Sequence, residues 1–476
     1  MRFFSSRYNY LLLVAIFAII VAFNFKKPMG FFRESNPALV CINSDFWMKH
    51  DSIRKLHIPV TSYAFNSGAS IESQLNSTCT TFGYGWFAAP YYFFSITHIP
   101  VGDIGIRIFS LCWLLFTLFG VYVLAKKIIA VYQLPKQLLP LIIWFYTLAP
   151  TVLWYNVHGY VHETAVLPFY FFAWAFFLDY LHNGNNIKQL LLTGLFLLVG
   201  VQFDWLPCLQ AFVMAIYLLL NKKRLKNQWA FLVPSLAILL GVAYIFYTYA
   251  SWAGTEKYIA FMKSKFLSRT VGAGNLNIIP FISHHFNIII FYAISFGMAA
   301  ILFIAGLIKR KPKNPIIWLM TGAAFLHHFV FWGFSSEHDH AALKMMFPIA
   351  FMAAIFIAAL KKNRQLVATL IVLLVNIGLY FFLHNYNYRK GIYRIPRYCS
   401  FLGETIKSIS TDPNELVFVD TDNKYFPQIE FYAGKSYIMA SSIEEAKLFI
   451  QKRGIVGKGC FVKMGYDGSY IESKHF

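Results

Sequence analysis

The sequence predicts an α-helical protein that crosses a membrane about eleven times and carries a small α/β domain at its C-terminal end. Three observations lead to this prediction. Of the 476 residues, 58% are hydrophobic and only 13% are charged, an apolar fraction that soluble domains rarely reach. Apolar runs long enough to span a bilayer recur as far as residue 384. Lys and Arg are distributed unevenly among the segments that join these runs.

The apolar runs set the expected helices. A membrane-spanning helix needs about 20 mostly apolar residues. The first run follows Arg2 and Arg7 and lacks a small-residue cleavage site, so we expect an uncleaved helix there. Run length and charge together predict helices at 8–25, 106–125, 137–155, 162–181, 188–204, 205–220, 229–249, 286–308, 315–334, 341–360 and 365–384.

The short connecting segments alternate in charge. Those at 126–136, 188, 221–228, 309–314 and 361–364 contain Lys and Arg but no Asp or Glu. The segments between them, at 156–163, 203–205 and 335–340, contain no Lys or Arg. Positively charged loops stay on the cytoplasmic side, so the N-terminus is expected in the cytoplasm and the C-terminus outside it. The surplus of positive charge, 42 Lys and Arg against 21 Asp and Glu, therefore does not indicate nucleic-acid binding.

This topology predicts a transmembrane domain at 1–384 and an extracytoplasmic α/β domain at 385–476. Two long outer loops belong to the first, at 26–105 and 249–285, and the broken aromatic stretch "FGYGWFAAPYYFFSI" suggests helices lying in the membrane interface. In the tail, "NELVFVDTD" and "GKGCFVKMG" have the pattern of strands. Ser442 and Glu445 form a capping box that starts a helix ending at Gly454.

Several titratable residues fall on the predicted outer side. Charged and imidazole side chains at helix ends are costly to remove from water, so their convergence suggests an outward-facing polar cavity. These residues are Asp45, His158, His162, Glu163, Asp204, Glu337, His338, Asp339 and His340.

Most of them allow two interpretations. His158 and His162 would share a face of a helix and could bind a metal, but an isolated pair at a helix end is more often structural. Asp204 followed by Trp205 favours a tight turn with an interfacial aromatic anchor, and orientation of the site is the competing role. Lys344 lies four residues after His340 and must either reach outward or meet an anion.

Two further features stay open. The basic residues Lys257, Lys263 and Arg269 in the second outer loop could contact lipid headgroups or a specific phosphate. Cys41 and Cys79 both fall outside, and their spacing leaves open whether they pair.

In the order and sidedness of its motifs the chain resembles the GT-C superfamily of membrane glycosyltransferases, especially the branch of protein O-mannosyltransferases and aminoarabinose transferases. The similar stretches are Asp45 in the first outer loop, 83–127, "APTVLWYNVHGYVHETAVLPFYFFAWAFF", "VQFDWLPCL" and "EHDHAALKMMFPIAF". The family's His-Pro-Pro is here Ala88-Ala89-Pro90 after Phe87, and Glu163 stands where relatives often have Asp.

The resemblance implies transfer of a sugar from a polyprenyl-phosphate donor to an extracytoplasmic glycan, lipid or protein at the bacterial inner membrane. It implies Asp45 as the base and Glu163 as its partner or a metal ligand. The residues expected to bind the donor phosphate are Lys344, His338, His340, Arg269, Lys257 and Lys263. Some relatives use a divalent metal, and the residues that could hold one are His158, His162, Glu163 and Asp339.

An alternative class is a membrane transporter or a lipid-binding or assembly protein without enzymatic activity. Charges at the membrane edge could then act as a relay. That alternative predicts paired broken helices and pseudo-symmetric halves, and the sequence shows neither.

Overall fold

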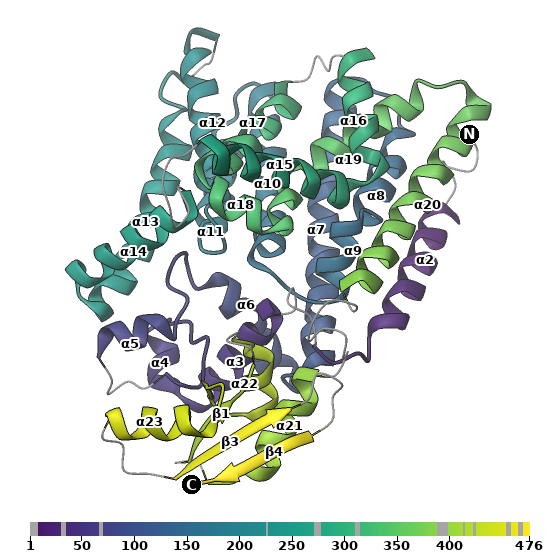
Figure 1. Cartoon of the computed structure of the whole chain (residues 1–476). Coiled ribbons are helices and arrows are strands. Elements are labelled where there is room, and N and C mark those ends of the chain that lie inside the picture. Colours follow the sequence, from purple (N-terminus) through teal and green to yellow (C-terminus); the bar gives the residue numbers. More distant parts are fainter. Residues whose placement is uncertain are drawn as a thin grey trace. The chain divides into compact units, whose positions relative to one another are not determined.

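The computed structural model describes residues 8–29, 35–65, 70–224, 227–270, 278–309, 315–387, 398–412, 415–421, 425–453, 458–464 and 470–476 (Figure 1). The chain forms two compact units. The helical unit comprises residues 1–24, 81–86 and 108–381, and the mixed unit comprises 25–80, 87–107 and 382–476.

The helical unit is built from α-helices and two short 3₁₀ helices. Its elements are α2 (Tyr8–Asn24), most of α7 (Asp103–Val131), α8 (Leu138–Thr147), α9 (Pro150–Val157), α10 (His162–His182), α11 (Ile187–Gly200), α12 (Leu206–Leu220), η2 (Lys222–Arg224), α13 (Leu232–Ala253), α14 (Thr255–Thr270), α15 (Ile278–Phe296), α16 (Met298–Lys309), α17 (Pro315–Val330), α18 (Trp332–Glu337), η3 (Asp339–Met345), α19 (Met346–Ala358) and most of α20 (Lys362–Asn387).

Five of the described helices are long and apolar enough to cross a membrane. They are α7, α10, α13, α20 and the continuous stretch His340–Ala358, and the number rises to seven if each of two bent helix pairs is one span. Four shorter apolar helices are α2, α11, α12 and α17. The predicted multi-pass helical architecture is confirmed, whereas the count of eleven spans is not.

The two bent pairs correct the expectation that the chain has no broken helices. The axes of α8 and α9 differ by 58°, and those of α15 and α16 by 103°. At the first break Ala149 is extended, with ψ 138°, because the ring of Pro150 disfavours a helical conformation in the residue before it. At the second break Gly297 has φ 53°, which a residue without a Cβ adopts at little cost.

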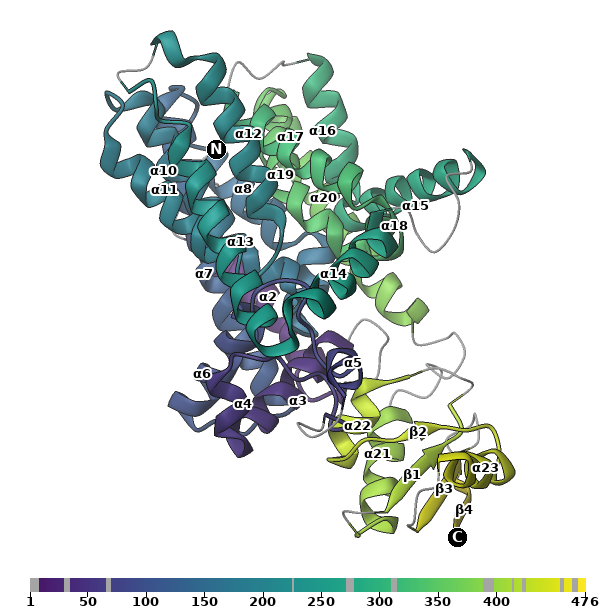
Figure 2. The same cartoon turned by 90° about the vertical axis from the view of Figure 1, so that its left-hand side faces the viewer.

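The most enclosed helix stretches are α10 and α19, whose apolar spans are mostly buried inside the unit. α10 packs against α11, α11 against α13, and α19 against both α8 and α16 (Figure 2). In contrast, α13 exposes Leu236, Leu239 and Leu240, as expected of a helix with lipid on one side.

The mixed unit combines helices from the N-terminal third with an α/β fold near the C-terminus. Its helices and strands are α3 (Ser35–Lys49), α4 (Asp51–Lys55), α5 (Ile71–Asn76), most of α6 (Gly85–Thr97), the first turn of α7, α21 (Tyr398–Ile409), β1 (Leu416–Val419), α22 (Pro427–Ala433), β2 (Ile438–Met439), α23 (Ile443–Arg453), β3 (Gly459–Met464) and β4 (Tyr470–His475). Within it Cys41 is buried as a free thiol, so the disulfide left open by the sequence is not formed.

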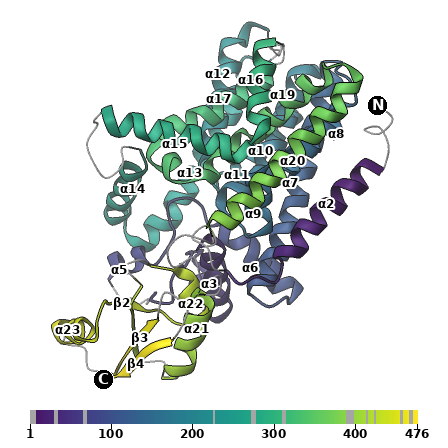
Figure 3. The ribbon, with the colours of Figure 1, turned by 45° about the vertical axis from the view of Figure 1, so that its right-hand side comes forward.

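The sheet has strand order β2-β1-β3-β4. β1 is parallel to β2 and to β3, with Phe418 opposite Phe461, and β4 is antiparallel to β3. Alternate residues of the central strands face opposite sides of the sheet. Val417 and Val419 pack with α21 and α22, while Phe418 packs with α23, so helices cover both faces (Figure 3).

The two predicted strands and the predicted helix start of this tail are confirmed. The two predicted strands are β1 and β3. The backbone N–H of Glu445 donates to Ser442 Oγ at 3.2 Å, which is the first half of the capping box, and the Glu445 carboxylate accepts from Ser441 N at 2.8 Å. The predicted helix end at Gly454 lies outside the described residues.

Candidate active site

Glu163 lies in the first turn of α10, where the helix begins after an extended residue. Val161 has φ −122° and ψ 158°, and its N–H donates to Thr164 Oγ1 at 3.2 Å. A carboxylate is favourable here because the N-terminus of a helix carries partial positive charge. Pro168 lies inside the same helix and has no N–H, so the carbonyl of Thr164, four residues earlier, receives no helical hydrogen bond from it.

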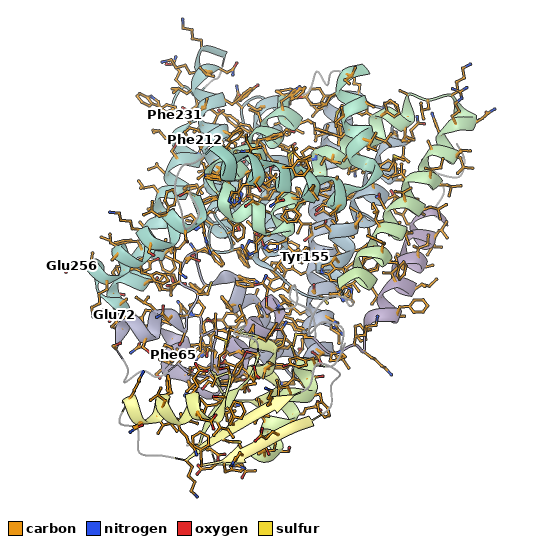
Figure 4. The ribbon with its side chains drawn as sticks, viewed as in Figure 1. Phe65, Glu72, Tyr155, Phe212, Phe231 and Glu256 are labelled. Atoms are coloured by element: carbon orange, nitrogen blue, oxygen red, sulfur yellow. The ribbon has the colours of Figure 1, made fainter. Side chains whose placement is uncertain are left out.

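Glu163 is fully buried between two imidazoles. Its Oε1 lies 3.0 Å from His162 Nε2 and 3.3 Å from His340 Nε2. His340 comes from η3, and its ring meets that of Tyr155 on α9 at a centroid distance of 5.3 Å (Tyr155 is labelled in Figure 4). Neither carboxylate oxygen accepts a well-formed hydrogen bond from the described residues. The three side chains therefore form a buried group of two imidazole nitrogens and a carboxylate.

A second buried carboxylate, Asp204, is adjacent. Its Oδ1 accepts a 2.7 Å hydrogen bond from Leu206 N, which satisfies a backbone donor at the start of α12. The same oxygen lies 3.8 Å from Lys344 Nζ, and Oδ2 lies 3.6 Å from His162 Nε2. His162 thus contacts both carboxylates, Glu163 and Asp204.

Lys344 is completely buried, with 0% of its side chain exposed. Its Nζ lies 2.8 Å from Nε2 of His327, which belongs to the last turn of α17. A buried ammonium needs a negative partner, and Asp204 supplies it. The structure therefore joins Lys344 to Asp204 and His327.

Arg269 is the more accessible cation near this group. Its guanidinium donates to Thr81 Oγ1 at 3.2 Å and lies 5.5 Å from the ring centroid of Phe334. Arg269, His162 and Asp204 line a small pocket with the rings of Phe82 and Phe334. The backbone that places Thr81 is held by Trp205, whose indole N–H donates to Thr81 O at 2.8 Å.

Asp45 belongs to α3 of the mixed unit. Lys49 Nζ and the Tyr63 hydroxyl both donate to Asp45 Oδ2, at 2.7 Å and 2.8 Å. Burial, and next the nearby charge of Asp45, raises the pKa of Tyr63, so this hydroxyl keeps its proton and donates. The carboxylate keeps 26% side-chain exposure and is accessible to a reactant.

The backbone around Asp45 is fixed by buried neighbours in α3. Asn43 Oδ1 accepts from Val60 N at 2.8 Å, and the Trp47 indole N–H donates to Ile58 O at 2.8 Å. These contacts hold the helix against the chain that leads to Tyr63. Tyr63 in turn donates its backbone N–H to Glu430 Oε2 at 3.2 Å.

The remaining predicted site residues lie elsewhere or have other contacts. His158 and His162 do not share a helix face, because α9 ends at Val157 and α10 begins at His162. His158 stacks on Trp154 and lies 3.0 Å from the Tyr380 hydroxyl. Lys257 and Lys263 are exposed on α14.

His338 stacks on Phe334 at 4.3 Å, and its ring lies 5.0 Å from that of His340. The backbone of Asp339 is described as the start of η3. The side chains of Glu337 and Asp339 lie outside the described part of the chain.

Sequence reasoning missed His327, Thr81 and Phe82 as parts of this region. The sequence contains a signal for His327, because the pair "HH" at 327–328 interrupts an otherwise apolar helix. Polar residues in such helices usually face the protein interior. Thr81 and Phe82 carry no such signal, because their position depends on a backbone contact with the 202–205 turn.

No family model matches the sequence, and no curated protein matches it. Several solved structures are similar to this chain. ArnT from Cupriavidus metallidurans, bound to undecaprenyl phosphate, is 11% identical over 96% of this chain and 93% of its own, with a TM-score of 0.61.

Two structures from Archaeoglobus fulgidus also match. The oligosaccharyltransferase in complex with Zn and sulfate is 12% identical over 94% of this chain and 68% of its own, with a TM-score of 0.57. AglB in complex with an inhibitory peptide and a dolichol-phosphate is 11% identical over 96% and 70%, with a TM-score of 0.56. At such identities the likeness concerns the fold, which this chain shares with these solved structures.

Proposed function

We propose that this protein is an integral-membrane glycosyltransferase that moves a sugar from a polyprenyl-phosphate donor to an extracytoplasmic acceptor. Beyond the shared fold, one observation carries the proposal. Two buried carboxylates, Glu163 and Asp204, meet the imidazole of His162 beside a pocket that Arg269 lines. Such a group is costly to bury and is expected where charged reactants are handled.

The reaction requires a base and a site for the leaving phosphate. Asp45 would accept the proton of the acceptor hydroxyl while that oxygen attacks the anomeric carbon of the donor sugar. The bond from this carbon to the phosphate oxygen breaks, and the electron pair leaves with the polyprenyl phosphate. Attack from the opposite side inverts the anomeric carbon. Because a phosphate departs without protonation, the reaction differs from glycoside hydrolysis, which uses a carboxylic acid as well as a base.

Arg269 is our first candidate for contact with the donor phosphate, because a guanidinium binds phosphate oxygens in a bidentate manner and this one lines the pocket. His340 and His338 would add hydrogen-bond donors at the same edge. Lys344 would act on the phosphate through its electrostatic field and without direct contact, since it is buried against Asp204. Lys257 and Lys263, exposed on the helix that carries Arg269, suit the headgroups of membrane lipids.

A divalent metal would fit the group of His162, Glu163 and His340. One ligand atom from each lies within 4.8 Å of the other two, and the Glu163 oxygens are buried without a well-formed hydrogen bond. Two imidazoles and a carboxylate form a common ligand set for zinc. Such an ion would supply positive charge for the phosphate, as Lys344 and Arg269 do with their side chains.

The proposal places the protein in a bacterial inner membrane, with its N-terminus in the cytoplasm and residues 385–476 outside. The acceptor would be a glycan, a lipid or a protein of the cell envelope. The alternation of Lys and Arg between connecting segments supports this orientation.

The test uses purified protein in detergent, a labelled polyprenyl-phosphate sugar, and an extract of bacterial envelope glycans, lipids and proteins that supplies the acceptor hydroxyl. We expect release of polyprenyl phosphate, with Asp45→Asn reducing it at least 100-fold, in the range of general-base catalysis. Asp51→Asn is the matched control, since Asp51 follows α3 but is 57% exposed and pairs with Lys55. Equal turnover by both variants would remove Asp45 as the base.

A transporter is the competing function, and the two bent helix pairs are the observation that favours it. In sealed vesicles a transporter would move the sugar-loaded lipid across the membrane without breaking the sugar–phosphate bond. Flux without release of polyprenyl phosphate would replace our proposal with that function.

A further inference from the structure

The mixed unit contains a cavity of about 800 Å³ that the proposed reaction does not yet use. Its volume lies within the range of about 300–1,000 Å³ typical of small-molecule sites. Residues near the end of α3, the segment around Tyr63, and the ends of α21 and α22 form its wall. The cavity is therefore assembled from the N-terminal third and the C-terminal domain of the chain.

This cavity adjoins the candidate base. Tyr63 and Lys49 line the cavity, and both donate to Asp45 Oδ2. Asp45 is thus one side chain away from the cavity wall. A reactant seated in the cavity would approach the carboxylate that we assign to proton removal.

One side of the cavity is aromatic. Phe46, Tyr63 and Phe65 belong to its lining, and the rings of Phe46 and Phe65 meet edge to face at 5.6 Å (Phe65 is labelled in Figure 4). Such rings offer a flat apolar surface to the C–H groups of a sugar. The hydroxyl of Ser436, also in the lining, suits a polyhydroxylated ligand.

The charged side chains in the lining all belong to basic residue types. They are Lys49, His50, Lys407 and Lys435, and no Asp or Glu is among the described residues of the lining. Lys49 is neutralised by Asp45, whereas Lys407 is exposed at the end of α21. The cavity therefore favours a ligand with negative charge.

Lys435 is held in a defined position. Its Nζ donates to Ser410 O, Ser410 Oγ and Asp412 O, each at 2.9 Å. The preceding Gly434 has φ 67°, the left-handed conformation that ends α22 and turns the chain toward Lys435. This cation is prearranged rather than a freely moving surface lysine.

We propose that this cavity is the acceptor site and that the acceptor is a saccharide carrying a phosphate or carboxylate group. The proposal rests on the proposed glycosyl transfer, and it adds the chemical class of the acceptor. The aromatic side would pack on the sugar ring, Lys407 would bind the anionic group, and a hydroxyl would reach Asp45 past Tyr63. Lys435, whose three N–H groups already donate to Ser410 and Asp412, would add positive charge without a direct hydrogen bond.

The test measures binding without any donor, using the full-length protein in detergent. Glucose 6-phosphate is the probe and glucose is its neutral counterpart, with saturation-transfer NMR as the readout. We expect glucose 6-phosphate to bind at least tenfold more tightly than glucose. Lys407→Glu should weaken its binding at least tenfold, and Ser436→Trp, which places an indole ring in the cavity, should also weaken it at least tenfold.

Lys452→Glu is the matched control, because it makes the same charge change at an exposed position on α23 outside the cavity lining. It should leave binding unchanged. Thermal unfolding of each variant reports whether a loss of binding reflects misfolding. Lys407 is exposed, so its substitution removes no buried contact.

Equal binding of glucose and glucose 6-phosphate would overturn the anionic class of ligand. If Lys407→Glu and Lys452→Glu weakened glucose 6-phosphate binding equally, or if Ser436→Trp bound it fully, the ligand would not bind in this cavity. Donor turnover is measured separately, so release of polyprenyl phosphate with no effect at the cavity would leave the proposed function standing. Binding at the cavity without donor turnover would reject the transferase and keep the saccharide site.

Discussion

Glu430 provides the sharpest test of the mixed unit, because its carboxyl is buried and linked to the segment that orients Asp45. The residue is 1% exposed, and its Oε1 and Oε2 accept from Ser62 Oγ at 3.1 Å and from Tyr63 N at 3.2 Å. Burial raises the pKa of Glu430 from 4.5 to about 7, and hydrogen bonds from Ser62 and Tyr425 only partly oppose the rise. We choose Glu430→Gln, a neutral side chain of the same shape.

The direction in which pH changes the stability follows from the difference between the pKa of Glu430 in the folded state and in the unfolded state. Since the folded pKa lies above the unfolded one, the folded state binds the proton more tightly between pH 4.5 and about 7. The stability from this group is fully present below pH 4.5 and is lost as the pH rises through about 7. At 1.36 kcal/mol per pKa unit, the wild type loses about 3 kcal/mol across this window. The Glu430→Gln variant has no titratable group at this position. Its free energy of unfolding relative to wild type should therefore rise by about 3 kcal/mol across the same window.

Thermal unfolding of the full-length protein in detergent at pH 5, 6, 7 and 8 measures this difference. For a unit of this size about 3 kcal/mol corresponds to roughly 6–12 °C in Tm. Glu445→Gln is the control. Hydrogen bonds from Ser441 lower the pKa of the Glu445 carboxyl, so it is ionised throughout this range and its difference from wild type should stay constant. A constant difference for Glu430→Gln as well would refute the reasoning.

Four further predictions follow from the contacts of the two units. Lys344→Met should destabilise the protein by about 3–5 kcal/mol in a chemical-denaturation assay, because it leaves Asp204 buried without its cation; adding Asp204→Asn should recover part of the loss, and an additive double variant would contradict the pairing. Gly83→Ala should cost about 1–3 kcal/mol, since a Cβ there would lie 2.5 Å from Gln202 Cα, whereas Gly322→Ala, with open space, should not. Tyr63→Phe removes a hydrogen bond to Asp45 and should slow donor turnover about 2- to 10-fold with unchanged donor binding, so a loss as large as that of Asp45→Asn would assign Tyr63 a larger role. Zinc bound per molecule, measured by mass spectrometry after dialysis, should fall in His340→Ala but not in His158→Ala; equal zinc content in all three proteins would argue against an ion at Glu163.

Local sequence patterns predicted the tail well. The alternation in 416–419 and the capping box at Ser442 depend on neighbours within a few residues, and β1 and α23 form where expected. Helices also lie in each of the long apolar runs. The bend at Ala149 could have been predicted from Pro150. The 103° break at Gly297 could not, because a single glycine in an apolar run does not indicate whether or how far the helix bends.

The candidate site was predictable only in part. Spacing placed Lys344 one turn from His340 and suggested a shared role. In the structure His340 contacts Glu163 while Lys344 contacts Asp204 and His327, because η3 is a 3₁₀ helix with about three residues per turn. The contact with His327 joins residues 17 positions apart, a separation that no periodic pattern encodes.

Composition and charge by themselves determined that this chain is a multi-pass membrane protein, because bilayer insertion depends on summed hydropathy and on loop charges that are local properties of the sequence. The order of motifs indicated the fold class. Only the tertiary structure decided which charges meet: His162 lies between Glu163 and Asp204, Lys344 lies beside Asp204, and Tyr63 donates to both Asp45 and Glu430. Those pairings arise from packing between residues far apart in the sequence and from the cost of burying an unpaired charge. Residues adjacent in the sequence carry no information about either.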